Sequence, residues 1–297
     1  MILNIKENHK VIPHFQNILD IHKSNLHIAL LTPFNPMFAG GYPMALLFAP
    51  REKHDNQMIK KGFYSDYDVY FSDQESYEGA LNTLKDPSKI IPPDNIIETD
   101  NATTFCFPCA DTITGYPLQI QLVKKIISPP KEILKTFDFI NCAVGFSPTD
   151  ESLYMHKEVF KYHNCRELEI LDPWMLNQVT EETKNNVVIQ ISRFRKYCER
   201  WDYTLGSKAF WKLIEVYNKY PKLKTERGIV ITAEGQHAYS GVRYLVEANT
   251  NIWGAMLSLL NIHPEWKNFK DSHGYLVPEA NDSFVSGSEI LQDDIPF

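Results

Sequence analysis

Asp66 and Asp68 are the residues whose type and spacing point most directly to chemistry. They alternate with aromatic and branched residues in SDYDVYF, residues 65–71, a composition typical of a β-strand, so both carboxylates are expected on one face. Two carboxylates one pleat apart repel each other unless a cation lies between them. Magnesium, or manganese in its place, is a hard divalent ion that prefers such oxygen ligands. The aspartate pair (Asp66 and Asp68) therefore predicts a metal site.

Two glycines, Gly40 and Gly41, lie upstream of the aspartate pair and open a short apolar helix that Pro50 ends. Glycine lets the backbone approach a phosphate, and a helix N-terminus favours anions. Together, the glycines and the aspartates predict a site that holds a nucleoside triphosphate with its metal ions for in-line attack by an acceptor hydroxyl. The alternative for Asp-x-Asp is a solvated strand edge or turn, and the glycines and apolar flanks favour the metal site.

The elements that must position these residues alternate between helix and strand in the first half of the chain. Periodicity predicts helices at 12–24, 44–48, 75–84 and after Pro129, with a polar loop at 51–63. It predicts strands at 27–31, 67–71, 96–107, 118–126 and 139–146.

Beyond residue 150 the pattern changes to helical spacing over residues 174–220. One stripe is formed by Val187, Val188, Ile191, Phe194 and Cys198. The polar stretch 147–152 marks the expected boundary, which divides the chain into residues 1–148 and 149–297. The predicted class is α+β: a mixed sheet with flanking helices, then a mainly helical domain whose last thirty residues form a loosely packed tail.

The bulk composition excludes several classes of protein. The 297 residues include 37 acidic and 30 basic ones, a net charge of -7 that argues against a general nucleic-acid coat protein. We find no secretory signal and no apolar stretch long enough for a bilayer, so no membrane partner is expected. Five irregularly spaced cysteines indicate reduced thiols in the cytoplasm. Cys106 and Cys109 form a CxxC without a second pair, so ordinary strand or turn cysteines are favoured over a zinc or redox site.

Four segments of the chain resemble the polymerase-β-like nucleotidyltransferases, nearest to the bacterial-type tRNA CCA-adding and poly(A) polymerases. AGGYPMALLF at 39–48 is similar to the family's GGxVRDxLLG opening, and SDYDVYF at 65–71 matches its metal-binding strand. FDFINCAVGF at 137–146 is similar to RRDFTINA, and ISRFRKYCERWDYTLG at 191–206 more loosely resembles RAxRFAxxLGFxI. The chain departs from the family in lacking the Arg-Asp after Gly-Gly and the base-reading helix, and in its longer gap before Asp66.

The resemblance implies a role for each matching residue. The aspartate pair would bind the catalytic metal ions, and Gly40, Gly41 and Ser65 would belong to the triphosphate site. Asp138 and Asn141 would contact the sugar. Arg193 and Arg195 would reach phosphates, with solvent exposure on an amphipathic helix as an equal alternative for each.

A third carboxylate, usual in the wider superfamily, is expected on the strand 118–123, which instead offers Gln119 and Gln121. A glutamine can ligate a metal through its carbonyl oxygen but cannot accept a proton as a base. Asp100, Asp111 or Asp138 is a substitute from a neighbouring strand; otherwise the site is impaired.

The predicted reaction moves a nucleoside monophosphate from an NTP to an acceptor hydroxyl by two-metal catalysis. The resemblance implies an RNA 3′ end or a tRNA as acceptor, while a small molecule or a protein side chain stays open. One alternative is a catalytically silent binding or structural module of the same fold. Another is a toxin- or defence-type transferase that modifies tRNA. The stand-alone architecture hints at a virus or phage, which would place the chain in the host cytoplasm.

Overall fold

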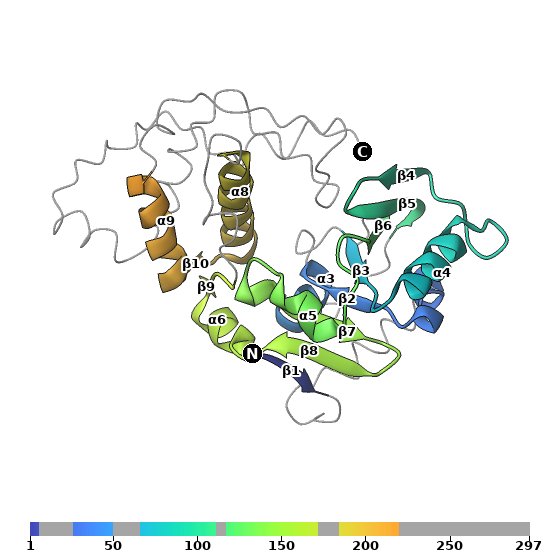
Figure 1. Ribbon diagram of the computed structural model, residues 1–297, viewed down its shortest axis with the longest axis horizontal. Coiled ribbons are helices and arrows are strands. Elements are labelled where there is room, and N and C mark those ends of the chain that lie inside the picture. Colours follow the sequence, from blue (N-terminus) through green and yellow to red (C-terminus); the bar gives the residue numbers. More distant parts are fainter. Residues whose placement is uncertain (6–25, 50–65, 111–116, 172–183, 220–297) are drawn as a thin grey trace, which may run out of the picture.

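A mixed eight-stranded sheet forms the centre of the part of the chain that the computed structural model describes, residues 1–5, 26–49, 66–110, 117–171 and 184–219 (Figure 1). Within the sheet β3 and β6 run parallel, and the other neighbouring strands are antiparallel. The predicted α+β class is confirmed. The strands follow one another across the sheet in the order β1 (Ile2–Ile5), β8 (Ser152–His156), β7 (Val144–Ser147), β2 (Met37–Ala39), β3 (Tyr67–Tyr70), β6 (Pro117–Val123), β5 (Ala102–Ala110) and β4 (Asn95–Glu98).

One face of the sheet is covered by α3 (Gly41–Phe48) and α4 (Gln74–Lys85). Tyr42 of α3 packs on Tyr67 of β3 with ring centroids 4.4 Å apart, and Phe38 of β2 meets the same two rings edge-on. Tyr67 and Val69 are almost completely buried on this face. Because strand side chains alternate, Asp68 points to the opposite face.

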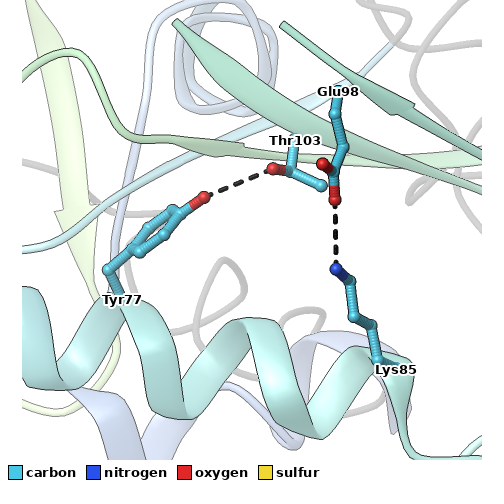
Figure 2. Close-up of polar contacts among 4 residues, drawn as sticks. All are labelled: Tyr77, Lys85, Glu98 and Thr103. Atoms are coloured by element: carbon cyan, nitrogen blue, oxygen red, sulfur yellow. Dashed lines mark hydrogen bonds and ion pairs between the residues drawn. The ribbon is translucent and has the colours of Figure 1, made fainter. Parts of the chain in front are cut away.

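Helix α4 is tied to the β4–β5 hairpin by two polar contacts (Figure 2). The hydroxyls of Tyr77 and Thr103 lie 3.3 Å apart in a buried position, and Lys85 lies 3.0 Å from Glu98 at the surface. Asp73 caps the helix N-terminus by accepting a hydrogen bond from the backbone N–H three residues on. These contacts fix α4 to the β4 edge of the sheet (Figure 1).

The opposite face carries a smaller apolar cluster under α5 (Pro130–Lys135). Ile133 and Leu134 of this helix pack with Met37, Ala39 and Tyr154 from the sheet, and Phe137 borders the cluster. Ala39 and Asp68 are partners across the β2–β3 ladder, so Asp68 lies on this face.

The helices that follow the sheet are α6 (Val159–Cys165), α8 (Lys184–Trp201) and α9 (Ser207–Lys219), joined by the parallel pair β9 (Glu167–Leu168) and β10 (Thr204–Leu205). The predicted stripe on α8 is confirmed for Ile191, Phe194 and Cys198, all buried. Phe139 packs edge-on against Phe194, with ring centroids 4.8 Å apart, and so joins α8 to the chain after α5. None of the described helices is long and apolar enough to cross a membrane.

Three predicted elements differ in the structure. The strand at 27–31 is wrong: α2 (Leu26–Ala29) forms there and η1 (Thr32–Phe34) follows, because a short apolar run has no periodicity that separates strand from helix. The run 96–107 is two strands, β4 and β5, with a turn at Asn101. The strand at 139–146 begins only at Val144, because η2 (Ile140–Cys142) turns the chain first.

The expected boundary at 147–152 falls within the hairpin that joins β7 to β8. The sheet therefore continues to His156, and the division of the chain into two domains stays a prediction. The helix expected at 12–24, the loop at 51–63 and the loosely packed tail lie outside the described residues.

Candidate active site

The aspartate pair stands at the beginning of β3. Asp66 directly precedes the strand and is 8% exposed, while Asp68 is half-buried within it. Burial, and then the charge of Asp66, raise the pKa of Asp68 well above its usual range, although Lys196 and Arg193 pull in the opposite direction. A cation beside the two carboxylates would relieve this repulsion.

Gly40 brings the start of α3 against the aspartate pair. A Cβ atom at Gly40 would lie 3.4 Å from Oδ2 of Asp68 and 3.4 Å from the Phe137 ring, and the φ of +81° disfavours any side chain. The N–H of Gly40 donates to the carbonyl of Val144. A helix start leaves its first N–H groups without an intrahelical carbonyl, and at α3 the first of these belongs to Gly41.

A neutral amide occupies the position beside Asp68 on the next strand. Gln121 of β6 pairs with Asp68 across the ladder, is 6% exposed, and donates from Nε2 to Oγ1 of Thr104 at 3.0 Å. The side chains of Asp68, Gln121 and Thr104 thus form one row on the α5 face. Among the described residues, no group of three or more His, Cys, Asp or Glu side chains is arranged to hold a metal ion.

The donors in this row nevertheless fit a hard divalent cation. Two neighbouring carboxylates, of which Asp66 disfavours the charged form of Asp68, next to an amide with a carbonyl oxygen, match the oxygen preference of magnesium. The third carboxylate that we considered is not supplied by Asp100, which is exposed in the β4–β5 turn. Asp111 lies outside the described residues.

Asp138 forms an ion pair with α8. Its Oδ2 lies 2.5 Å from Nε of Arg193, and the two side chains are 9% and 19% exposed. Its backbone carbonyl accepts a hydrogen bond from Leu171. Asp138 therefore faces a cation of the following helix.

Asn141 is engaged with the backbone around β9. It is completely buried, its Nδ2 donates to the carbonyl of Glu167 at 2.9 Å, and its Oδ1 accepts from the N–H of Glu169 at 3.1 Å. Its own carbonyl is the partner of Nε2 of His163. These contacts give Asn141 a structural use, so our proposal for the nucleotide site leaves it out.

Arg195 lies on another side of α8 from Arg193. Its Nε is 2.6 Å from Glu199, one turn along the same helix, and both side chains are substantially exposed. Solvent exposure was one of the two alternatives predicted for Arg195. Of the two arginines, our proposal for the nucleotide site therefore includes only Arg193. Ser65 lies outside the described residues.

A comparison with protein families identifies the family of this chain. The model of the Gabija anti-defense 2 family matches residues 4–166, more than half of the chain. The chain belongs to the Gabija anti-defense 2 family. No curated protein matches it.

Solved structures of CCA-adding enzymes are similar to this family member at low identity. One in complex with ATP is 16% identical, with a TM-score of 0.45, covering 76% of this chain and 49% of the other. The Bacillus stearothermophilus enzyme in complex with CTP is 14% identical (TM-score 0.43; 71% and 45% covered). The Thermotoga maritima enzyme complexed with tRNA is 12% identical (TM-score 0.34; 86% and 71% covered). The chain spans about half the length of the first such structure, which is covered to 48%.

Lys196 and Phe137 border the site but were absent from the sequence analysis. Lys196 influences Asp68 from α8, and the Phe137 ring lies against Gly40. The spacing of Arg193 and Lys196, three residues apart on a helix, was the available signal for the lysine. Phe137 had none, because its position depends on how the chain leaves α5.

Proposed function

We propose that this Gabija anti-defense 2 family member is a nucleotidyltransferase that counteracts the Gabija defence. The carrying observation is the aspartate pair at the beginning of β3, against Gly40 at the start of α3. The family description supports the defence-related part of the proposal. The two roles form one activity if the transferred nucleotide inactivates or diverts a component that the defence needs.

Each group of the proposed site has a separate task. The aspartate pair holds the divalent ions, which when bound neutralise the phosphates and polarise the reacting oxygens. The N–H groups at the start of α3 receive phosphate oxygens, and Arg193 adds positive charge from α8. The acceptor hydroxyl forms a bond to the α-phosphorus as the bond to the β-phosphate breaks, releasing pyrophosphate and a proton.

An RNA 3′ end is the acceptor that we would test first, because the sequence resemblance implies it. The net charge of -7 gives the chain no general attraction for nucleic acid. An RNA acceptor therefore has to be recognised by local contacts, and total RNA is a suitable probe because it contains tRNA and other 3′ ends together.

The deciding experiment is magnesium-dependent transfer from each labelled NTP to total RNA. The variant Asp66→Asn with Asp68→Asn keeps the side-chain shapes and removes both charges. The matched control is Asp94→Asn with Asp100→Asn, two exposed aspartates outside the site. We expect wild type and control to transfer equally and the site variant to lose at least about a hundredfold. Equal transfer by the site variant would refute the proposal.

A silent binding module is the second candidate, favoured by Gln121 in the row where a third carboxylate is expected. The same two variants separate the candidates in cells that carry the Gabija defence. Loss of protection in the site variant alone supports the enzyme. Full protection by the site variant, with no change in thermal stability of wild type on adding magnesium and any NTP, supports the binding module.

A further inference from the structure

Gln121 lies between Asp68 and Thr104 in the sheet. It pairs with Asp68 of β3 on one side and with Thr104 of β5 on the other, so all three side chains point to the α5 face. Gln121 and Thr104 are 6% and 5% exposed. Neighbouring strands are about 4.8 Å apart, so the amide of Gln121 can reach either neighbour. The role of this amide therefore depends on which of its two ends faces Asp68.

The amide of Gln121 gives its N–H to Thr104 and not to Asp68. Nε2 donates to Oγ1 of Thr104 at 3.0 Å, and among the described residues this is the one side-chain hydrogen bond of Gln121. The nitrogen and the oxygen of an amide point away from each other, so an amide with its nitrogen toward β5 turns Oε1 toward β3. The carbonyl end of Gln121 therefore faces the carboxylate of Asp68.

This orientation is unfavourable for the two protein groups alone. A carboxylate and an amide oxygen are both acceptors, so side by side they repel each other. Turning the amide over would give Asp68 an N–H donor, and a hydrogen bond to a carboxylate is stronger than one to a hydroxyl. A divalent cation reverses this preference, because it takes oxygen ligands from both side chains. The observed orientation of Gln121 therefore suits a metal ion beside Asp68.

We propose that Gln121 is a neutral third metal ligand beside the aspartate pair, and that Thr104 is a positioning residue that holds its carbonyl oxygen toward the ion. The inference rests on the proposed function, and it also predicts how the metal arrives. Two carboxylates and an amide carry one negative charge fewer than three carboxylates, and metal affinity depends on the number of charged ligands. The site therefore binds the free ion weakly and takes it up together with the nucleotide, whose phosphates supply further negative charge.

The role of Thr104 is tested by the affinity of the protein for Mn²⁺ without nucleotide, measured by electron paramagnetic resonance of the free ion. Thr104→Val keeps the side-chain shape and removes the hydroxyl, so the amide of Gln121 can turn its N–H to Asp68. We expect Mn²⁺ binding to weaken by about tenfold, a loss typical when a group that orients a metal ligand is removed. Thr104→Ser restores the hydroxyl and should recover the wild-type affinity. Equal affinities for Thr104→Val and wild type would overturn the positioning role.

Thr103→Val is the matched control for this measurement. Thr103 precedes Thr104 on β5 and is also buried, but it lies on the opposite face, where its hydroxyl contacts Tyr77 (Figure 2). We expect this variant to bind Mn²⁺ as wild type does. An equal loss in both valine variants would mean that Mn²⁺ binding responds to any lost hydroxyl in β5, which would overturn the inference. If Thr104→Val does not fold, Gln121→Met removes the amide itself and should weaken Mn²⁺ binding similarly.

The joint uptake of metal and nucleotide is tested by calorimetry on wild type and Gln121→Glu. The binding of Mn²⁺ alone is compared with the binding of the Mn²⁺ complex of each of the four NTPs. We expect wild type to bind at least one complex about tenfold more tightly than the free ion, and Gln121→Glu to bind the free ion about tenfold more tightly than wild type. Wild type that binds free Mn²⁺ as tightly as every complex would contradict this part of the inference.

The failure of this inference is distinguishable from the failure of the proposed function. If wild type binds neither Mn²⁺ nor any of its NTP complexes, both are wrong. If wild type binds them, and only the Asp66→Asn and Asp68→Asn variant weakens binding, the site at the aspartate pair stands, and Gln121 and Thr104 are excluded from it.

Discussion

The beginning of β3 and the N-terminus of α9 both enclose acidic side chains, and they treat the charge in opposite ways. At α9 the carboxylate of Glu169, 2% exposed, accepts three backbone hydrogen bonds of 2.9, 3.1 and 2.9 Å. Two of these donors belong to the first turn of the helix, whose dipole also favours a negative charge. The three N–H groups are those of Ile170, Lys208 and Ala209.

At β3 the main neighbour of the half-buried Asp68 charge is another negative charge, Asp66. Burial and this neighbour both disfavour the charged form of Asp68. A fold that keeps such a pair gives up stability there, as functional sites commonly do. Burial of a carboxylate therefore does not by itself identify a functional site. A better indication is a carboxylate whose strongest charged neighbour is another carboxylate.

The largest expected effect comes from removing the Glu169 carboxylate, whose charge is compensated by backbone N–H groups. Glu169→Ala should lower the free energy of unfolding by about 3 kcal/mol, because three charge-assisted hydrogen bonds disappear and buried N–H groups lose their acceptor. Chemical denaturation measures the change. Glu215→Ala, on the exposed side of the same helix, should stay within about 0.5 kcal/mol. A loss for Glu169→Ala as small as that of the control would remove Glu169 as a structural anchor.

A third negative charge next to Asp68 should increase the charge repulsion at β3. Gln121→Glu places a carboxylate next to Asp68, so without metal we expect the free energy of unfolding to fall by about 2 kcal/mol. Excess magnesium should restore most of the loss, because three carboxylates hold the ion better than two. The matched change is Asn95→Glu, at an exposed position of β4. Failure of magnesium to restore Gln121→Glu more than Asn95→Glu would argue against a metal site in this row.

The beginning of β3 is also the region that the sequence predicted best. Strand alternation and the Gly-Gly turn are local, so SDYDVYF correctly predicted the strand that carries Asp68, and the helix after Gly40 formed as expected. Short, strongly patterned segments carry this information without knowledge of the rest of the chain.

Contacts between distant segments account for what the sequence did not predict. Asp138 and Arg193 form their ion pair across 55 positions, and Asn141 holds the backbone of β9. Glu169 caps a helix that begins nearly forty residues later. These partners depend on how α8 and α9 pack against the segment after α5, which no local pattern encodes.

Relief of the charge repulsion at β3 should give a smaller, stabilising effect. Asp66→Asn should raise the free energy of unfolding by about 1 kcal/mol in EDTA, since Asp68 then faces a neutral amide. Excess magnesium should stabilise wild type more than the variant, so the advantage should shrink or reverse. Asp100→Asn, exposed and distant from the pair, should change nothing in either condition. Destabilisation by Asp66→Asn in EDTA would mean that the pair is already compensated within the fold.

The smallest expected effect is a pH dependence of the free energy of unfolding that arises from Asp68. Because the pKa of Asp68 is higher in the folded than in the unfolded chain, the folded state binds more protons between the two values. The contribution of Asp68 to the stability of wild type must then fall as pH rises from the ordinary aspartate pKa to the raised one, and level off above it. Asp68→Asn lacks this titration, so in EDTA its stability advantage over wild type should grow across that interval. An advantage of Asp68→Asn that is constant with pH would mean that Asp68 titrates alike in the folded and unfolded states.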